Sequence, residues 1–111
     1  MRNLPDSVPI KGIAYGVRLV TQRTLRRISK MKCPLDEWTD TDRRIIYVDR
    51  ACDEREKWSA LLHGMMHAAF GEAHKADPIA LDLKELEESV ILLLESALFP
   101  ALRATGWGPQ E

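Results

Sequence analysis

The sequence predicts a small α+β domain, in which a short N-terminal β-sheet packs on two helices. Strand-like alternation of apolar residues fills the first half of the chain, and helix-like spacing fills the second. Apolar residues make up 45% and charged residues 30% of the chain, an ordinary composition for a globular domain. With 111 residues, the chain is expected to form one domain over residues 1–111.

The first half of the chain predicts strands between about residue 8 and residue 50. Residues 8–22 mix β-branched and aromatic side chains in an alternating pattern, which predicts one strand. The alternating residues are Ile13, Tyr15, Val17 and Leu19. Residues 24–32 are expected to form a short helix. Residues 33–42, rich in Pro, Asp and Thr, are expected to form a loop, and residues 43–50 a second strand.

Two helices are expected in the second half of the chain. The first spans about 53–70, because acidic residues in its first turn suit the helix dipole and Gly71 is a plausible stop. Its apolar stripe consists of Trp58, Leu61, Leu62, Met65 and Ala69. The second spans about 82–103. At about 100° per residue, its expected apolar face consists of Leu83, Leu86, Val90, Leu93, Leu94, Ala97, Leu98 and Ala101.

The stretch LLHGMMHAAF (residues 61–70) places two histidines, His63 and His67, four residues apart. Residues at this spacing share a helix face, so both imidazoles can reach one zinc ion. Between them stands Gly64, where the HExxH motif of metallopeptidases has the glutamate that acts as general base. Glycine costs a helix about 1 kcal/mol relative to alanine. Either the motif glutamate has been replaced, or a neighbouring backbone approaches closely.

A zinc site of this type needs a third protein ligand, and Glu87 is the candidate that the last helix offers. It falls inside the expected apolar face, where an unpaired carboxylate is costly, and zinc would be a suitable partner. An arginine of the sheet is the alternative partner. His74 is a rival ligand, although it comes one residue too late for HExxHxxGxxH. Glu88 is expected on the opposite face, and Glu72 beyond the end of the first helix.

The chain resembles the small zincin-like metallopeptidases of phages and prophages, which are loosely related to the ImmA/IrrE-type peptidases. The segments that carry the resemblance are IKGIAYGVRLV, DEWTDTDRRIIYVD, LLHGMMHA and LEESVILLLESALFPALRATGW. The resemblance implies a zincin-type α+β fold with zinc on His63, His67 and a glutamate of the final helix, here Glu87. It departs from the family at the central position, because Gly64 replaces the base.

The resemblance therefore implies a zinc-dependent enzyme that hydrolyses peptide bonds through a metal-bound water and acts on a peptide or protein substrate. Without a carboxylate at position 64, this chain is expected to be hydrolytically crippled, and Gly64→Glu is expected to restore hydrolysis. The alternative is a non-catalytic pseudopeptidase, a zinc-bearing module that binds a peptide or partner protein.

Other partners are not expected. The net charge of −1 attracts neither nucleic acid nor an anionic membrane, and the basic stretch 18–32 is expected to be a solvated face. The longest apolar run is shorter than the ~20 residues of a membrane span. Because no leader opens the chain, the cytoplasm of a bacterium or phage-infected cell is the expected location. Cys33 and Cys52 lack CxxC spacing and are expected to be buried free thiols.

Overall fold

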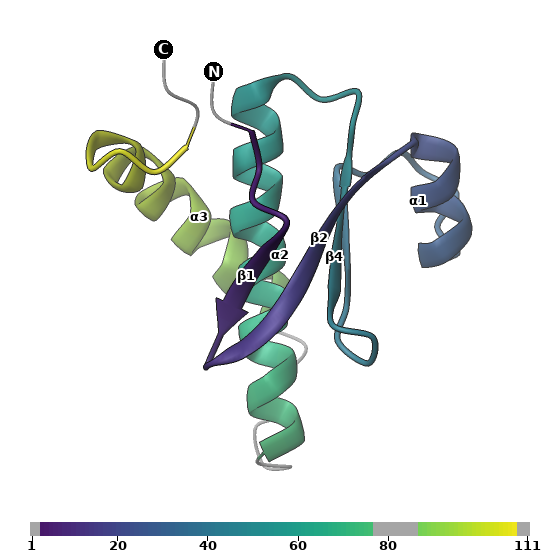
Figure 1. Cartoon of the computed structure of the whole chain (residues 1–111), viewed down its shortest axis with the longest axis horizontal. Coiled ribbons are helices and arrows are strands. Elements are labelled where there is room, and N and C mark those ends of the chain that lie inside the picture. The colour runs from purple at the N-terminus through teal and green to yellow at the C-terminus, as the bar shows by residue number, and fades with distance from the viewer. Residues whose placement is uncertain (1–2, 77–86, 109–111) are drawn as a thin grey trace.

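A computed structural model describes residues 3–76 and 87–108 and confirms the α+β class. The strands are β1 (Ser7–Ile10), β2 (Ile13–Val20), β3 (Glu37–Asp40) and β4 (Ile45–Asp49). The helices are α1 (Gln22–Ser29), α2 (Glu54–Ala76) and α3 (Glu87–Ala104). Figure 1 shows α2 running along the sheet, with α3 crossing it and α1 at the opposite side of the molecule.

The four strands form one mixed sheet in the order β1-β2-β4-β3. β2 and β4 are parallel, whereas β1–β2 and β3–β4 are antiparallel pairs. The predicted strand 8–22 is in fact a hairpin, because Lys11 and Gly12 both adopt positive φ (52° and 79°) and turn the chain. The alternation continues on both sides of this two-residue turn, so the sequence pattern suggested a single strand.

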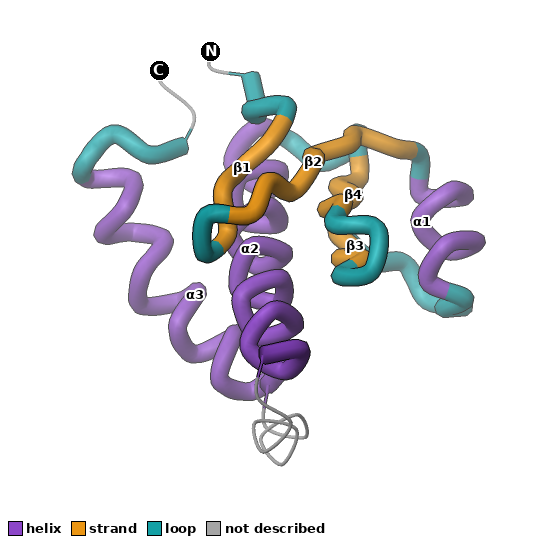
Figure 2. The backbone as a smooth tube through the Cα atoms, turned by 60° about the horizontal axis from the view of Figure 1, so that its bottom comes forward, coloured by secondary structure: helices purple, strands orange, loops and turns teal. Residues whose placement is uncertain are grey.

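The edge strand β3 lies inside residues 33–42, so the prediction of a loop there is wrong. Trp38 pairs with Tyr47, and Thr39 with Ile46 of β4. The strand is short, Trp38 is its one apolar residue, and its four residues are only partly buried, so a hydrophobicity pattern does not reveal it. Figure 2 shows β3 and β4 together beside α2. Since β3 is the last strand of the sheet, one of its edges pairs with no other strand among residues 3–76 and 87–108.

Helix α2 continues to Ala76, so the prediction that it stops at Gly71 is wrong. An added Cβ at Gly71 would lie 2.3 Å from Thr41 Cγ2, so this glycine permits close packing inside the helix. Glu72 therefore lies within the helix and is buried. Its carboxylate accepts hydrogen bonds from the Tyr15 hydroxyl, from Arg44 (3.5 Å) and from Lys75 (3.2 Å). The Tyr15 hydrogen bond, with further help from both cations, outweighs burial and lowers the pKa of Glu72 to about 2.

The described part of α3 begins at Glu87, so the predicted start at residue 82 and the positions Leu83 and Leu86 lie outside the described residues. The predicted apolar face is wrong. Ile91 and Phe99 are buried, whereas the predicted inner residues Val90, Leu93, Leu94 and Leu98 are 36–70% exposed. The helix is turned by about one residue, or ~100°, from the predicted orientation. Leucines on several sides of this helix obscure its inner face.

The core joins the sheet to α2 and to the end of α3. Its largest fully buried side chains are Tyr15, Leu25, Ile46, Leu61, Ile91 and Val48. Trp58 and Trp107 meet edge to face at 4.8 Å between ring centroids, and both pack in or against the core. Cys33 is exposed and Cys52 partly exposed, so neither is the buried thiol that was expected.

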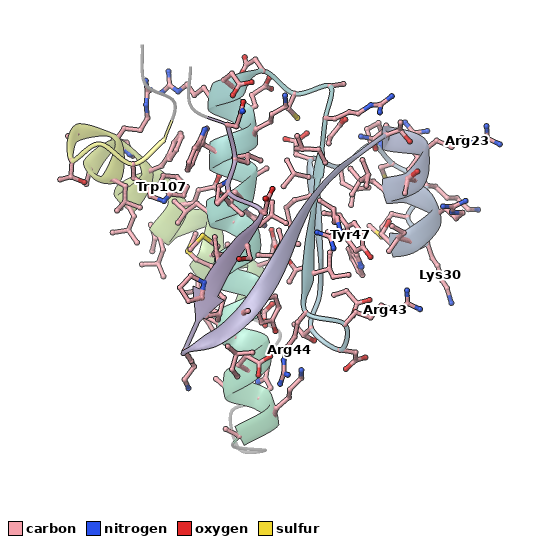
Figure 3. All side chains as sticks on the ribbon, in the orientation of Figure 1. Arg23, Lys30, Arg43, Arg44, Tyr47 and Trp107 are labelled. Atoms are coloured by element: carbon pink, nitrogen blue, oxygen red, sulfur yellow. The ribbon has the colours of Figure 1, made fainter. Side chains whose placement is uncertain are left out.

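The basic stretch 18–32 includes α1, and Figure 3 shows Arg23 and Lys30 extending from this helix toward solvent. No helix within residues 3–76 and 87–108 combines the length and apolar content needed to cross a membrane.

Candidate metal centre

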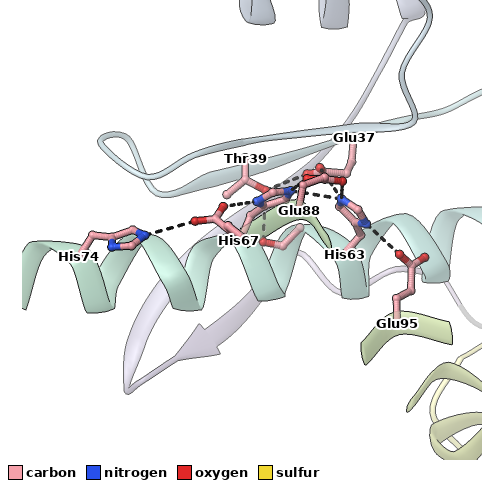
Figure 4. A network of polar contacts seen from close by, with 9 residues as sticks. Glu37, Thr39, His63, His67, His74, Glu88 and Glu95 are labelled. Atoms are coloured by element: carbon pink, nitrogen blue, oxygen red, sulfur yellow. Dashed lines mark hydrogen bonds and ion pairs between the residues drawn. The ribbon is translucent and has the colours of Figure 1, made fainter. Parts of the chain in front are cut away.

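His63 and His67 of α2 converge as the i, i+4 spacing predicts. Their side chains are largely buried, at 15% exposed for His63 and 21% for His67. The two Nε2 atoms lie 3.2 Å apart, and the ring centroids 4.9 Å apart. Figure 4 shows both rings directed from α2 toward β3 and the start of α3. This arrangement offers two nitrogen ligands to one ion.

Each histidine is held at its outer nitrogen by a carboxylate of α3. His63 Nδ1 lies 2.8 Å from Glu95 Oε2, and His67 Nδ1 lies 2.5 Å from Glu87 Oε2. Ser59 donates a hydrogen bond of 2.5 Å to the other oxygen of Glu95. Because a carboxylate accepts hydrogen bonds, each Nδ1 is the donor in these contacts, and a ring with its proton there would offer the Nε2 lone pair to a metal. Metal-binding histidines are oriented in this way.

The predicted third ligand, Glu87, thus reaches His67 from the Nδ1 side. Its second oxygen lies 3.3 Å from His74 Nε2. His74 lines the same groove but contacts Glu87 rather than the two Nε2 atoms. Glu87 therefore contacts His67 at Nδ1, and His74 contacts Glu87, so both lie away from the two converging Nε2 atoms.

Glu88 occupies the inner position instead. Its two carboxylate oxygens lie 3.0 Å from His63 Nε2 and 2.8 Å from His67 Nε2. The expectation that Glu88 lies on the opposite face is therefore wrong. Since successive residues of a helix point about 100° apart, Glu87 and Glu88 bracket the His67 ring from its two nitrogens. Glu88 is 57% exposed, so this side of the site is open to solvent.

A further carboxylate, Glu37 of β3, was missed because its segment was predicted to be a loop. Its Oε1 lies 3.9 Å from His63 Nε2, and its Oε2 accepts a 2.8 Å hydrogen bond from Thr39. The side chain is 10% exposed, and burial raises the pKa of Glu37. Glu37, His63 and His67 supply atoms that all lie within 4.8 Å of one another, which is compatible with one metal ion. The sequence feature that could have revealed β3 is the alternation of Glu37 and Thr39 shortly before the β-branched residues of β4.

Gly64 faces β3 and β4. An added Cβ would lie 2.6 Å from Ile46 Cγ2 and 3.0 Å from both Glu37 Oε2 and Thr39 Oγ1. The Thr39 hydroxyl also lies 3.2 Å from the Gly64 carbonyl oxygen. Position 64 therefore has no room for a side chain unless its neighbours move. The alternative, a close approach by a neighbour, describes it better, although the neighbours are side chains.

The electrostatics of the cluster favour a cation. Burial lowers the pKa of His63, but the hydrogen bond to Glu95 and the charges of Glu37 and Glu88 outweigh burial, and the net shift is upward. A positive charge is thus stabilised at these nitrogens. Two imidazoles with a carboxylate form one of the donor sets that bind Zn²⁺, so the residues present are compatible with this ion.

The cluster opens into a groove of about 1030 Å³ between β3, α2 and α3. Met31, Leu35 and Leu92 add apolar surface to its polar lining. The groove is large enough for several residues of an extended peptide, by the usual size of ligand pockets.

Comparisons with protein-family models, with curated proteins and with solved structures gave no match to this chain.

Proposed function

We propose that this chain binds one zinc ion through His63 Nε2, His67 Nε2 and the Glu88 carboxylate, and that it is a zinc-dependent metallopeptidase. The convergence of two Nε2 atoms 3.2 Å apart, each ring held at Nδ1 by a carboxylate, is the observation that carries the proposal. Bound zinc would polarise a peptide carbonyl and make water a better nucleophile. The proposed location is the cytoplasm of a bacterium or phage-infected cell.

The chain's own residues would orient the reaction. Glu95 and Glu87 fix the tautomer of the two imidazoles, and Ser59 fixes Glu95. β3 is the last strand of the sheet and its residues line the groove, so an extended peptide in the groove would be able to pair with this strand and present its backbone to the cluster. A peptide or protein is therefore the proposed substrate.

A second candidate function is a zinc-bearing module that holds a peptide without cleaving it. Gly64 favours this candidate, because the helix lacks the glutamate that would serve as base. Both candidates need the same metal, so metal binding is the first test and hydrolysis the second.

The full chain, purified without chelator, should contain about one zinc per molecule by elemental analysis. His67→Ala should lose most of it, because one of the converging nitrogens is removed. His74→Ala is the matched control on the same helix and should retain the zinc. At a free zinc concentration of 100 times Kd, the metal should stabilise the fold by about 2.7 kcal/mol. A chain without zinc, and without a thermal shift on zinc addition, would refute both candidate functions.

A further inference from the structure

We propose that Glu37 of β3 takes over the role of the glutamate that position 64 lacks, as the base beside the metal. This inference rests on the proposed function. It assigns the missing carboxylate to a strand instead of the helix, and it makes Gly64 a requirement of that arrangement.

The carboxylate and a side chain at position 64 compete for one space. The Glu37 oxygen Oε2 lies 3.0 Å from the point that a Cβ at position 64 would occupy. A side chain there would clash with Ile46 and crowd Glu37 and Thr39. The glycine thus leaves the room in which a carboxylate from the neighbouring strand stands.

Thr39 fixes the direction of this carboxylate. Its hydroxyl lies 2.8 Å from Glu37 Oε2 and 3.2 Å from the Gly64 carbonyl oxygen, so it links strand and helix. With Oε2 engaged, Oε1 is the oxygen directed at the histidines, 3.9 Å from His63 Nε2 (Figure 4). The side chain is nine-tenths buried, so its position is set by packing.

Glu37 and Glu88 divide the two carboxylate roles. Glu88 lies within 3.0 Å of both Nε2 atoms, which suits a metal ligand. The 3.9 Å separation of Glu37 Oε1 from His63 Nε2 exceeds direct hydrogen-bond distance, so Glu37 stands beside the two nitrogens and farther from them than Glu88. Glu37 is therefore placed to act on a water at the metal.

Hydrolysis of the peptide bond needs water as its only co-reactant. Glu37 accepts a proton from the attacking water, while the water oxygen forms a bond to the peptide carbonyl carbon. The C–N bond then breaks, and the Glu37 carboxyl returns the proton to the leaving nitrogen, so that one carboxylic acid and one amine form.

Glu37→Gln tests this assignment, because it removes the charge and keeps the shape. Glu54→Gln is the control, because it makes the same substitution in the first turn of α2, where Glu54 pairs with Lys57. Each full-length variant is loaded with Zn²⁺ or Co²⁺. Glu37→Gln should bind one metal as the unchanged chain does. Azide should bind its Co²⁺ form at least ~10-fold more tightly, measured by visible absorption, because a negative charge beside the open position is gone.

Hydrolysis of a random peptide library, followed by mass spectrometry, is the second readout. The zinc-loaded unchanged chain and Glu54→Gln should cleave, and Glu37→Gln should be slower by roughly 10²–10⁴-fold. Loss of metal from Glu37→Gln would make Glu37 a ligand and overturn the proposal. Unchanged azide affinity, or no cleavage by the metal-loaded unchanged chain, would also overturn it. Failure of the unchanged chain to bind metal would instead refute the proposed function itself.

Discussion

Replacing Gly64 with alanine should destabilise the protein, although alanine is the better helix residue. The added Cβ would lie 2.6 Å from Ile46 Cγ2, whereas carbon atoms in contact normally stand about 3.5–4.0 Å apart. Ile46 is fully buried, so its methyl group has no free space to enter. Overpacking of this kind costs about 1–3 kcal/mol. The helix preference for alanine returns about 1 kcal/mol.

The net loss should therefore be up to about 2 kcal/mol, measured by urea unfolding of the full chain in the presence of chelator. For a domain of this size, a loss of about 2 kcal/mol corresponds to a fall in Tm of about 10 °C. Gly64→Glu should lose at least as much and should not restore hydrolysis, because it would place a second carboxylate against Glu37. The restoration expected from the sequence is thus replaced by the opposite prediction.

Two backgrounds isolate the cause. Ile46→Ala removes Cγ2, so in this background Gly64→Ala should be neutral or stabilising by up to ~1 kcal/mol. Ile46→Val keeps Cγ2, so the cost of Gly64→Ala should persist. Equal effects in the two backgrounds, or a higher stability of Gly64→Ala in the unchanged chain, would refute the packing argument.

Two further predictions concern carboxylates. Glu88→Ala should weaken zinc binding more than Glu87→Ala does. Because Glu87 contacts a ligand histidine at Nδ1 only, its removal should lower the zinc affinity by about 10–100-fold. Competition with a coloured chelator measures both affinities, and the reverse order would make Glu87 the inner ligand. The pKa of Glu72, ordinarily 4.5, is lowered to about 2, so its stabilisation is complete above pH ~5 and is lost as the pH falls toward 2. This contribution is at most about 3 kcal/mol. Glu72→Gln should therefore be less stable than the unchanged chain at pH 7 and should converge with it near pH 2, and a constant difference would contradict the assignment.

Local periodicity in the sequence predicted correctly those features that depend on residues close together in the chain. The α+β class, the strand ending at Asp49 and the shared face of His63 and His67 all follow from local periodicity. Local periodicity could not locate β3, because four residues with a single apolar side chain, Trp38, form a strand only through pairing with β4. Glu37 was missed for the same reason.

The inner face of α3 was mispredicted because leucine count alone does not decide which face is buried. Leu93 is 70% exposed while Ile91 is fully buried. The helix turns its acidic positions Glu88 and Glu95 toward the histidines, a preference that depends on a partner from α2. Gly71 was predicted to end the helix because glycine is common at helix ends, whereas its role here is to allow close packing against Thr41.

The dependence of α3 on the histidine cluster has a mechanical consequence. Its buried side chains are Ile91 and Phe99, eight residues apart, while Glu87, Glu88 and Glu95 reach across to α2. An ion held between the two helices would act as a cross-link at the end of α3 that has few apolar anchors. Docking of this helix and occupancy of the cluster are then a single equilibrium, and amide hydrogen exchange along Glu87–Glu95 reports both at once.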